Sequence, residues 1–179
     1  AKTGMLATAD IVEAVCAWWR LRGDRPPLVV DPVMVATSGD ALVGPRAVAA
    51  IRRELLPLAA VVTPNLPEAA ALLGVTLIDD AGDAARRLLP LCGDETIVVV
   101  KGGHSVDRSR SSDALALPDG RVFWLHAARV DTRCTHGTGC TLSAAIAAQI
   151  ALGATPADGV RAAKRYLTGA LEAAMEVGG

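Results

Sequence analysis

One stretch of the sequence places two glycines directly before a predicted helix. Gly137-Thr138-Gly139 offers unhindered backbone N–H groups at the positive end of the helix dipole, which suits a phosphate or a transferring phosphoryl group. The stretch is not a Rossmann fingerprint, which would need a third glycine where Leu142 stands, and the chain has no Gly-Lys-Ser/Thr triplet of a Walker A loop. The pattern indicates an anion-binding turn, with a plain tight turn into a buried helix as the alternative.

Cys140 follows this turn and falls in the first turn of the same predicted helix. The helix dipole and the free N–H groups favour a thiolate at such a position, so Cys140 is a candidate base or nucleophile. The alternative is a small buried apolar side chain, which is the commonest fate of an isolated cysteine.

Polar side chains also follow three apolar runs of the sequence. Asp31, Asn65 and Glu68 supply oxygen donors of the kind that Mg²⁺ prefers when it keeps several of its waters. Lys101 follows the third run, and its compact ammonium suits phosphate charge. The structural alternatives are a helix capping box made by Asn65 and Glu68, and a solvated strand end at Lys101.

The elements that must position these residues alternate between short β-branched runs and runs of helical period, which predicts an α/β fold with a mainly parallel sheet. Ligands bind at the carboxyl ends of the strands in such sheets. The expected strands are 28–30, 60–62, 96–100, 114–117 and 121–125, the last two forming a hairpin. Helices are expected from Thr8 or Asp10 to before Gly23, over about 45–56, 83–91 and 157–177, and from the turn at 135–140. We expect residues 1–179 to form one domain.

Composition narrows the function class. The 179 residues are 51% apolar and 21% charged, with a formal net charge of -1, which argues against disorder and against nucleic acid as a partner. No apolar run approaches the ~18 residues of a membrane-spanning helix, and no targeting segment opens the sequence. We therefore expect a soluble cytoplasmic protein that does not bind membranes.

Taken in order, the motifs resemble those of hydroxymethylpyrimidine and hydroxymethylpyrimidine-phosphate kinases of thiamine biosynthesis, which are ribokinase-like kinases. The motifs are Lys2-Thr3-Gly4-Met5, Val30-Asp31-Pro32-Val33-Met34, Thr63-Pro64-Asn65-Leu66-Pro67-Glu68, Val100-Lys101-Gly102-Gly103-His104 and Thr135-His136-Gly137-Thr138-Gly139-Cys140. The resemblance implies a three-layer α/β/α fold with a mainly parallel central sheet. The family's N-terminal part, with its first strand and a glycine-rich segment, is absent from this sequence.

The resemblance also implies roles for single residues in ATP-dependent phosphorylation. Gly137, Thr138, Gly139 and Cys140 would form the anion hole for the γ-phosphoryl group, with Cys140 at the position of the base. Asp31 and Glu68 would help to hold Mg²⁺ with its waters, Asn65 would assist, and Lys101 would neutralise nucleotide phosphate charge. Lys164 is a weaker candidate for a phosphate contact. Gly4, Met5 and Val33 would line the pyrimidine pocket, and 105–112 would be a flap near the nucleotide.

The implied substrate is a small pyrimidine, 4-amino-5-hydroxymethyl-2-methylpyrimidine, followed by its monophosphate. The implied full-length protein is a homodimer. A pyridoxine or pyridoxal kinase is the alternative enzyme, because the vitamin B6 kinases share the fold, the Asp-Pro-Val strand end and the glycine turn. An inactive module that binds nucleotide is the alternative from a different class.

Overall fold

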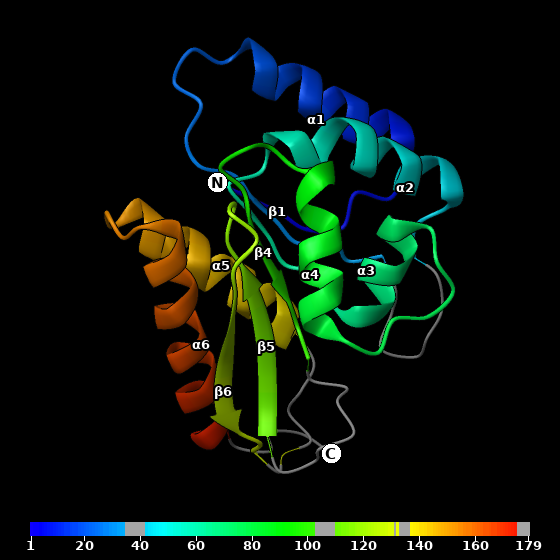
Figure 1. Ribbon diagram of the computed structural model, residues 1–179. Helices are drawn as coiled ribbons and strands as arrows, with labels where there is room; N and C mark the ends of the chain where they lie inside the picture. Colours follow the sequence, from blue (N-terminus) through cyan, green and yellow to red (C-terminus); the bar gives the residue numbers. More distant parts are fainter. Residues whose placement is uncertain (35–41, 103–109, 131, 133–136, 175–179) are drawn as a thin grey trace, which may run out of the picture.

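The fold is built around one six-stranded sheet with the strand order β1-β2-β3-β4-β5-β6 (Figure 1). A computed structural model describes residues 1–34, 42–102, 110–130, 132 and 137–174. Strands β1 to β4 are parallel, whereas β5 and β6 are antiparallel to their neighbours. The strands are β1 (Lys2–Thr3), β2 (Val29–Val30), β3 (Val61–Val62), β4 (Ile97–Val100), β5 (Arg110–Ala116) and β6 (Val122–Ala128). The prediction of a mainly parallel sheet is confirmed.

Helices cover both faces of this sheet, which gives the three layers that the sequence predicts (Figure 1). Helices α1 to α4 lie on one face, and α5 and α6 lie on the other. The helices are α1 (Ala9–Leu21), α2 (Pro45–Ala50), α3 (Leu66–Leu73), α4 (Ala81–Leu88), α5 (Thr138–Ala151) and α6 (Pro156–Glu172). Helix α2 continues through a π-helical turn, Ile51–Leu55, and a 3₁₀ turn, Leu56–Leu58, and a second 3₁₀ turn, Leu89–Leu91, follows α4.

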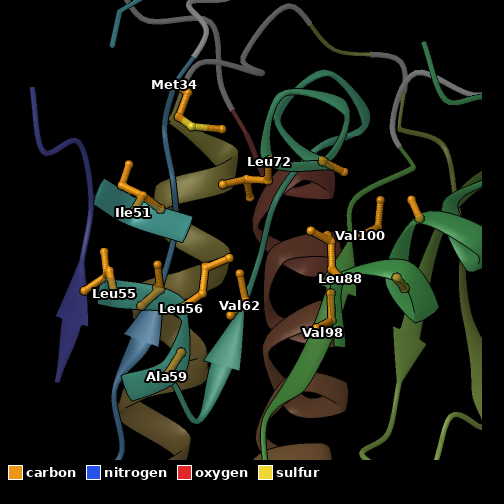
Figure 2. Close-up of a cluster of buried hydrophobic side chains, with 14 of the residues drawn as sticks. Met34, Ile51, Leu55, Leu56, Ala59, Val62, Leu72, Leu88, Val98 and Val100 are labelled. Atoms are coloured by element: carbon orange, nitrogen blue, oxygen red, sulfur yellow. The ribbon is translucent and has the colours of Figure 1, made fainter. Parts of the chain in front are cut away.

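Alternation along the buried strands divides the core between the two faces. Val62, Val98 and Val100 point into the cluster shown in Figure 2, where they pack with side chains such as Leu56 and Leu88. The neighbouring strand residues point to the opposite face and pack against α5 and α6; they are Val29, Val61, Ile97 and Val99. Because successive side chains of a strand point to opposite faces, a strand buried on both faces must be apolar throughout. This explains why the predicted strand segments show no alternation of apolar and polar residues.

Helix starts follow the capping residues of the sequence. The Thr8 hydroxyl accepts the N–H of Ile11, and the Asp80 carboxylate accepts the N–H of Asp83. Such side chains satisfy N–H groups that have no partner within the helix. The start of α1 within the predicted window is therefore confirmed.

Several boundaries differ from the prediction; β6, for example, runs to Ala128 and not only to 125. Residues 110–112 of the expected flap belong to β5, because their backbone pairs with residues 126–128 of β6, while 105–109 lie outside the described residues. Helix α6 ends at Glu172, since Ala173 leaves the helical conformation, and the predicted end near 177 lies outside the described residues. Within the described part of the chain, no helix combines the length and apolar character that crossing a membrane requires.

Candidate functional site

Asp31 is the centre of a buried polar cluster at the carboxyl end of β2. Its side chain is 1% exposed, and its backbone N–H donates to the carbonyl of Thr3 at 3.1 Å, which continues the β1–β2 pairing past the strands. The Oδ1 atom accepts from the Lys101 ammonium at 3.0 Å and from the Thr63 hydroxyl at 3.4 Å. The Oδ2 atom accepts from the Ser143 hydroxyl at 3.0 Å. Three donors from three different elements therefore satisfy this buried carboxylate.

Lys101 is fixed by the sheet as well as by Asp31. Its backbone N–H donates to the carbonyl of Pro64 at 2.8 Å, and an isolated parallel bridge pairs it with Asn65. The side chain is 17% exposed, and its Nζ atom lies 3.9 Å from Oε2 of Glu68. The alternative of a solvated strand end is wrong, because the Lys101 ammonium contacts buried carboxylates.

Glu68 and Asn65 form the capping box of α3. The Asn65 side chain accepts the Glu68 N–H at 2.8 Å, and Glu68 Oε2 accepts the Asn65 N–H at 2.8 Å. The other carboxylate oxygen, Oε1, accepts the Met34 N–H at 3.2 Å. The structural alternative for these two residues is thus realised. The capping box also orients the buried Glu68 carboxylate toward Lys101.

The N-terminus of α5 reaches the same cluster. Gly137, with φ of 79°, is the residue before the helix, and this left-handed backbone conformation favours glycine. A Cβ on Gly139 would lie only 3.2 Å from the Lys101 ammonium. Ser143, one turn further on, is the residue that donates to Asp31. The glycine turn and Lys101 are therefore neighbours.

Cys140 is exposed in the first turn of α5, so the alternative of a buried apolar side chain is wrong. Thr138 and Gly139, the two residues before it, are half-buried. A thiol at this position reaches solvent while its helix remains tied to Asp31 through Ser143. The exposed Cys140 thiol thus belongs to the same turn as Gly137 and Gly139.

Val33, Gly4 and Met5 lie beyond the ends of the neighbouring strands β2 and β1. Val33 has a φ of 43°, which is unusual for a β-branched residue, because the left-handed region brings Cβ close to the backbone. Its side chain is half-buried, whereas Met5 is 52% exposed. The sheet brings these three residues to the edge that holds Asp31, since Thr3 pairs with Val30.

Lys164 of α6 does not contact Asp31 or Glu68 but forms a separate buried pair. Its ammonium donates to Oδ2 of Asp113 at 2.7 Å and to the Ser111 hydroxyl at 3.0 Å. Oδ1 of Asp113 accepts the Gly102 N–H at 3.0 Å. This pair therefore adjoins the residue that follows Lys101.

Comparison with known proteins places the chain in a family. Residues 1–179 match the family described as phosphomethylpyrimidine kinase. The chain belongs to this family. It is 41% identical to a hydroxymethylpyrimidine/phosphomethylpyrimidine kinase of Haemophilus influenzae, over 99% of this chain and 66% of the relative. The chain thus spans slightly less than two thirds of that relative's length.

Two solved structures extend the comparison. A pyridoxal kinase of Bacillus subtilis, solved as an ADP complex, superposes with a TM-score of 0.88 at 34% identity, covering 99% of this chain and 66% of that one. A phosphomethylpyrimidine kinase of Clostridium difficile gives a TM-score of 0.76 at 31% identity, covering 95% and 68%. The predicted ribokinase-like fold and the family resemblance are confirmed.

The donor set of this family member suits a hydrated Mg²⁺ and not a cage of direct protein ligands. Among the described residues, no group of three or more His, Cys, Asp or Glu side chains is arranged to hold a metal. The cluster instead brings two carboxylates, Asp31 and Glu68, against the single ammonium of Lys101. Each carboxylate oxygen can accept more than one hydrogen bond. A cation that keeps its waters fits this excess of negative charge.

Sequence reasoning missed Thr63, Ser143 and Asp113 as members of these clusters. Thr63 was readable only as part of a strand-end motif, and Ser143 only as an interruption of an apolar helix. Both hydroxyls donate to Asp31, which is remote from them in the sequence; Ser143, for example, lies 112 positions from it. No local pattern could have revealed these contacts.

Proposed function

We propose that the full-length protein transfers a phosphoryl group from ATP to 4-amino-5-hydroxymethyl-2-methylpyrimidine, and then a second one to the resulting monophosphate, in thiamine biosynthesis. The observation that carries this proposal is the buried Asp31–Lys101 pair, which lies against the glycine turn of α5 in a chain of this family. The name of the Haemophilus influenzae relative supports the substrate. The ADP complex of the pyridoxal kinase supports the nucleotide.

In the proposed transfer, the Cys140 thiolate takes the proton of the substrate hydroxyl. The hydroxyl oxygen then forms a bond to the γ-phosphorus as the bond from that phosphorus to the β-phosphate oxygen breaks, which releases ADP. The backbone N–H groups at Gly137, Thr138, Gly139 and Cys140 would hold the charge on the transferred group, helped by the dipole of α5. Positioning and electrostatics supply most of the catalysis in phosphoryl transfer.

The charged residues have complementary roles in this proposal. Lys101 and, more weakly, Lys164 would neutralise phosphate charge. Asp31 and Glu68 would hold Mg²⁺ through its waters, with Asn65 assisting. When bound, Mg²⁺ supplies positive charge at the phosphate oxygens. Asp31 also keeps Lys101 in place, because their 3.0 Å contact is buried.

The pyrimidine would lie over Gly4, Met5 and Val33 at the ends of β1 and β2. The proposal also includes one domain over residues 1–179 and a cytoplasmic, homodimeric full-length protein, as the family resemblance implies. Nucleic acid and membranes have no part in it. Light scattering after gel filtration tests the dimer.

The test is a kinetic comparison in the full-length protein. Cys140→Ala should lower kcat by about 10²-fold, as for loss of a positioned base, and leave ADP affinity within about twofold. Cys92→Ala is the matched control, because Cys92 lies in another layer beside the carbonyl of Leu88, and it should retain kcat. An unchanged kcat in Cys140→Ala would remove Cys140 from the mechanism.

A second candidate function is that of a pyridoxal kinase, which the TM-score of 0.88 to the Bacillus subtilis pyridoxal kinase supports. Assays of hydroxymethylpyrimidine, its monophosphate and pyridoxal on one preparation decide between the two. A kcat/KM for pyridoxal above that for hydroxymethylpyrimidine would reverse the assignment. Nucleotide binding with no turnover of any of the three would instead indicate an inactive binding module.

A further inference from the structure

A second buried carboxylate lies beside the first cluster, on β5. Asp113 is 4% exposed, and each of its oxygens has a different partner. Its Oδ1 accepts the backbone N–H of Gly102 at 3.0 Å, and its Oδ2 accepts the Lys164 ammonium at 2.7 Å. One side chain therefore connects the end of β4 to α6, across the edge at which the predicted site residues gather.

The backbone at Gly102 has little conformational freedom. β4 and β5 pair from Val98 with Ala116 to Val100 with Ala114, so that Asp113 comes next on β5, beside the end of β4. Gly102 passes so close to the carbonyl of Ser112 that a Cβ at this position would collide with it. Because Gly102 directly follows Lys101, the Asp113 contact also limits the backbone that carries Lys101.

The other oxygen of Asp113 fixes Lys164. An ammonium has three N–H donors, and Asp113 and Ser111 accept two of them, which leaves capacity for one further acceptor. The Lys164 side chain is 11% exposed, so that its head group reaches the surface only in part. Its flexible stem would otherwise allow many rotamers, and ordering it in advance lowers the entropy that a ligand must overcome.

Stability alone gives a poor account of this pair. Burying two charges costs desolvation energy that their attraction only roughly offsets, so a buried ion pair is often no more stabilising than apolar side chains of the same volume. What such a pair does provide is a fixed position for each charge. Two lysines are held in this way near the end of β4: Lys101 by Asp31, and Lys164 by Asp113.

We propose that Asp113 is a positioning residue for nucleotide phosphate, holding the Lys164 ammonium ready for it while anchoring the backbone beside Lys101. This inference rests on the proposed function, because it takes the ligand of Lys164 to be a nucleotide. Asp113 itself does not touch the phosphate. The effect of its charge on nucleotide binding therefore passes through Lys164, whereas its contact with the Gly102 N–H acts on the backbone beside Lys101.

The experiment uses the full-length protein and three variants, Asp113→Asn, Lys164→Gln and the double variant. Asn keeps a carbonyl oxygen for the Gly102 N–H but removes the charge that faces Lys164. The ADP dissociation constant is measured by calorimetry, the KM for ATP and for hydroxymethylpyrimidine by steady-state kinetics, and stability by thermal unfolding. Arg161→Gln, one turn earlier on α6, removes an exposed ion pair with Asp158 and is the matched control.

We expect each single variant to raise the ADP dissociation constant and the KM for ATP by about tenfold, the size of one charge-assisted hydrogen bond. The KM for hydroxymethylpyrimidine should stay within about twofold. The double variant should bind ADP no more weakly than Lys164→Gln alone, because Asp113 acts through Lys164. It should also recover stability lost in Asp113→Asn, since no charge is then buried without a partner.

Additive effects in the double variant would overturn the inference, as would an Asp113→Asn protein of lowered stability but unchanged ADP affinity. If Asp113→Asn does not fold, the comparison of the double variant with Lys164→Gln still decides, because equal ADP affinities support the inference and a weaker double variant refutes it. Failure of the proposed function has a separate signature, namely a wild-type protein that binds ADP without phosphorylating hydroxymethylpyrimidine. The ADP affinities decide the role of Asp113 in that case too, and a wild-type protein that binds no ADP refutes it.

Discussion

Replacing Ser143 by alanine tests whether α5 is tied to the buried carboxylate of Asp31. The Ser143 hydroxyl has one hydrogen and three acceptors within reach. These are Oδ2 of Asp31 at 3.0 Å, the Gly139 carbonyl at 3.2 Å and the Cys140 carbonyl at 3.1 Å. The two carbonyls already belong to the helix, whereas Asp31 is charged and 1% exposed. We therefore expect the hydrogen to lie toward Asp31, since charge-assisted hydrogen bonds are the stronger ones.

The size of the effect follows from this assignment. Losing a buried hydrogen bond to a charged group costs about 1.5–3 kcal/mol. Alanine recovers about 0.5 kcal/mol, because it has a higher helix propensity than serine. The free energy of unfolding should thus fall by about 1–2.5 kcal/mol, which for a chain of this size lowers Tm by about 2–10 °C.

Denaturant-induced unfolding of the full-length protein measures this change. Thr168→Ala is the matched control, because the Thr168 hydroxyl also donates to a carbonyl one turn earlier, that of Lys164 at 3.0 Å. The control should be neutral or slightly stabilising. A Ser143→Ala protein that is as stable as the wild type would refute the tie to Asp31. In an Asp31→Asn background, the effect of Ser143→Ala should shrink, which a double-mutant cycle detects.

Two further predictions concern packing and thiol chemistry. Gly102→Ala should destabilise the protein by about 2 kcal/mol or more, because the new Cβ would collide with the Ser112 carbonyl. The control Gly169→Ala should stabilise it by about 0.5–1 kcal/mol, because Gly169 lies in α6 with open space around it. Equal unfolding midpoints for the two variants would contradict the close approach of Gly102 to Ser112. At pH 8, iodoacetamide should label the exposed Cys140 at least about 100-fold faster than Cys92, since burial raises the pKa of the Cys92 thiol to about 12 and keeps it protonated. Peptide mapping by mass spectrometry measures the two labelling rates, and comparable rates would contradict the burial of Cys92.

The parts of the fold that could be predicted from the sequence depend on local rules. Each of these rules involves only a few neighbouring residues. The structure has the predicted features in place, namely the Thr8 cap, the apolar strands and the Pro118-Asp119-Gly120 turn. The end of α6 at Glu172 has no such local signal, because the alanine-rich sequence continues past it without a residue that stops a helix. The polar residues at the start of β5 were assigned to a flap because strand pairing with β6, and not hydrophobicity, places them in the sheet.

The candidate site divides in the same way. Strand ends located Asp31 and Lys101, because parallel strands bring their carboxyl ends to one edge of the sheet. Their mutual contact spans 70 positions, and the Lys164–Asp113 pair spans 51. The first contact depends on the order of the strands in the sheet, and the second depends on how α6 packs against the sheet. That packing has no local signature in the sequence.

Val33 shows how a local rule gives way at the same edge. A β-branched residue at φ of 43° costs of order 1–3 kcal/mol, so neighbouring contacts must hold it there. On one side Asp31 is fixed by three donors, and on the other the Met34 N–H is bound by Glu68. The chain between two anchored residues has few conformations left, and the strain at Val33 follows from them. The contacts that fix Asp31 and Glu68 therefore also fix the backbone over which we propose that the pyrimidine lies.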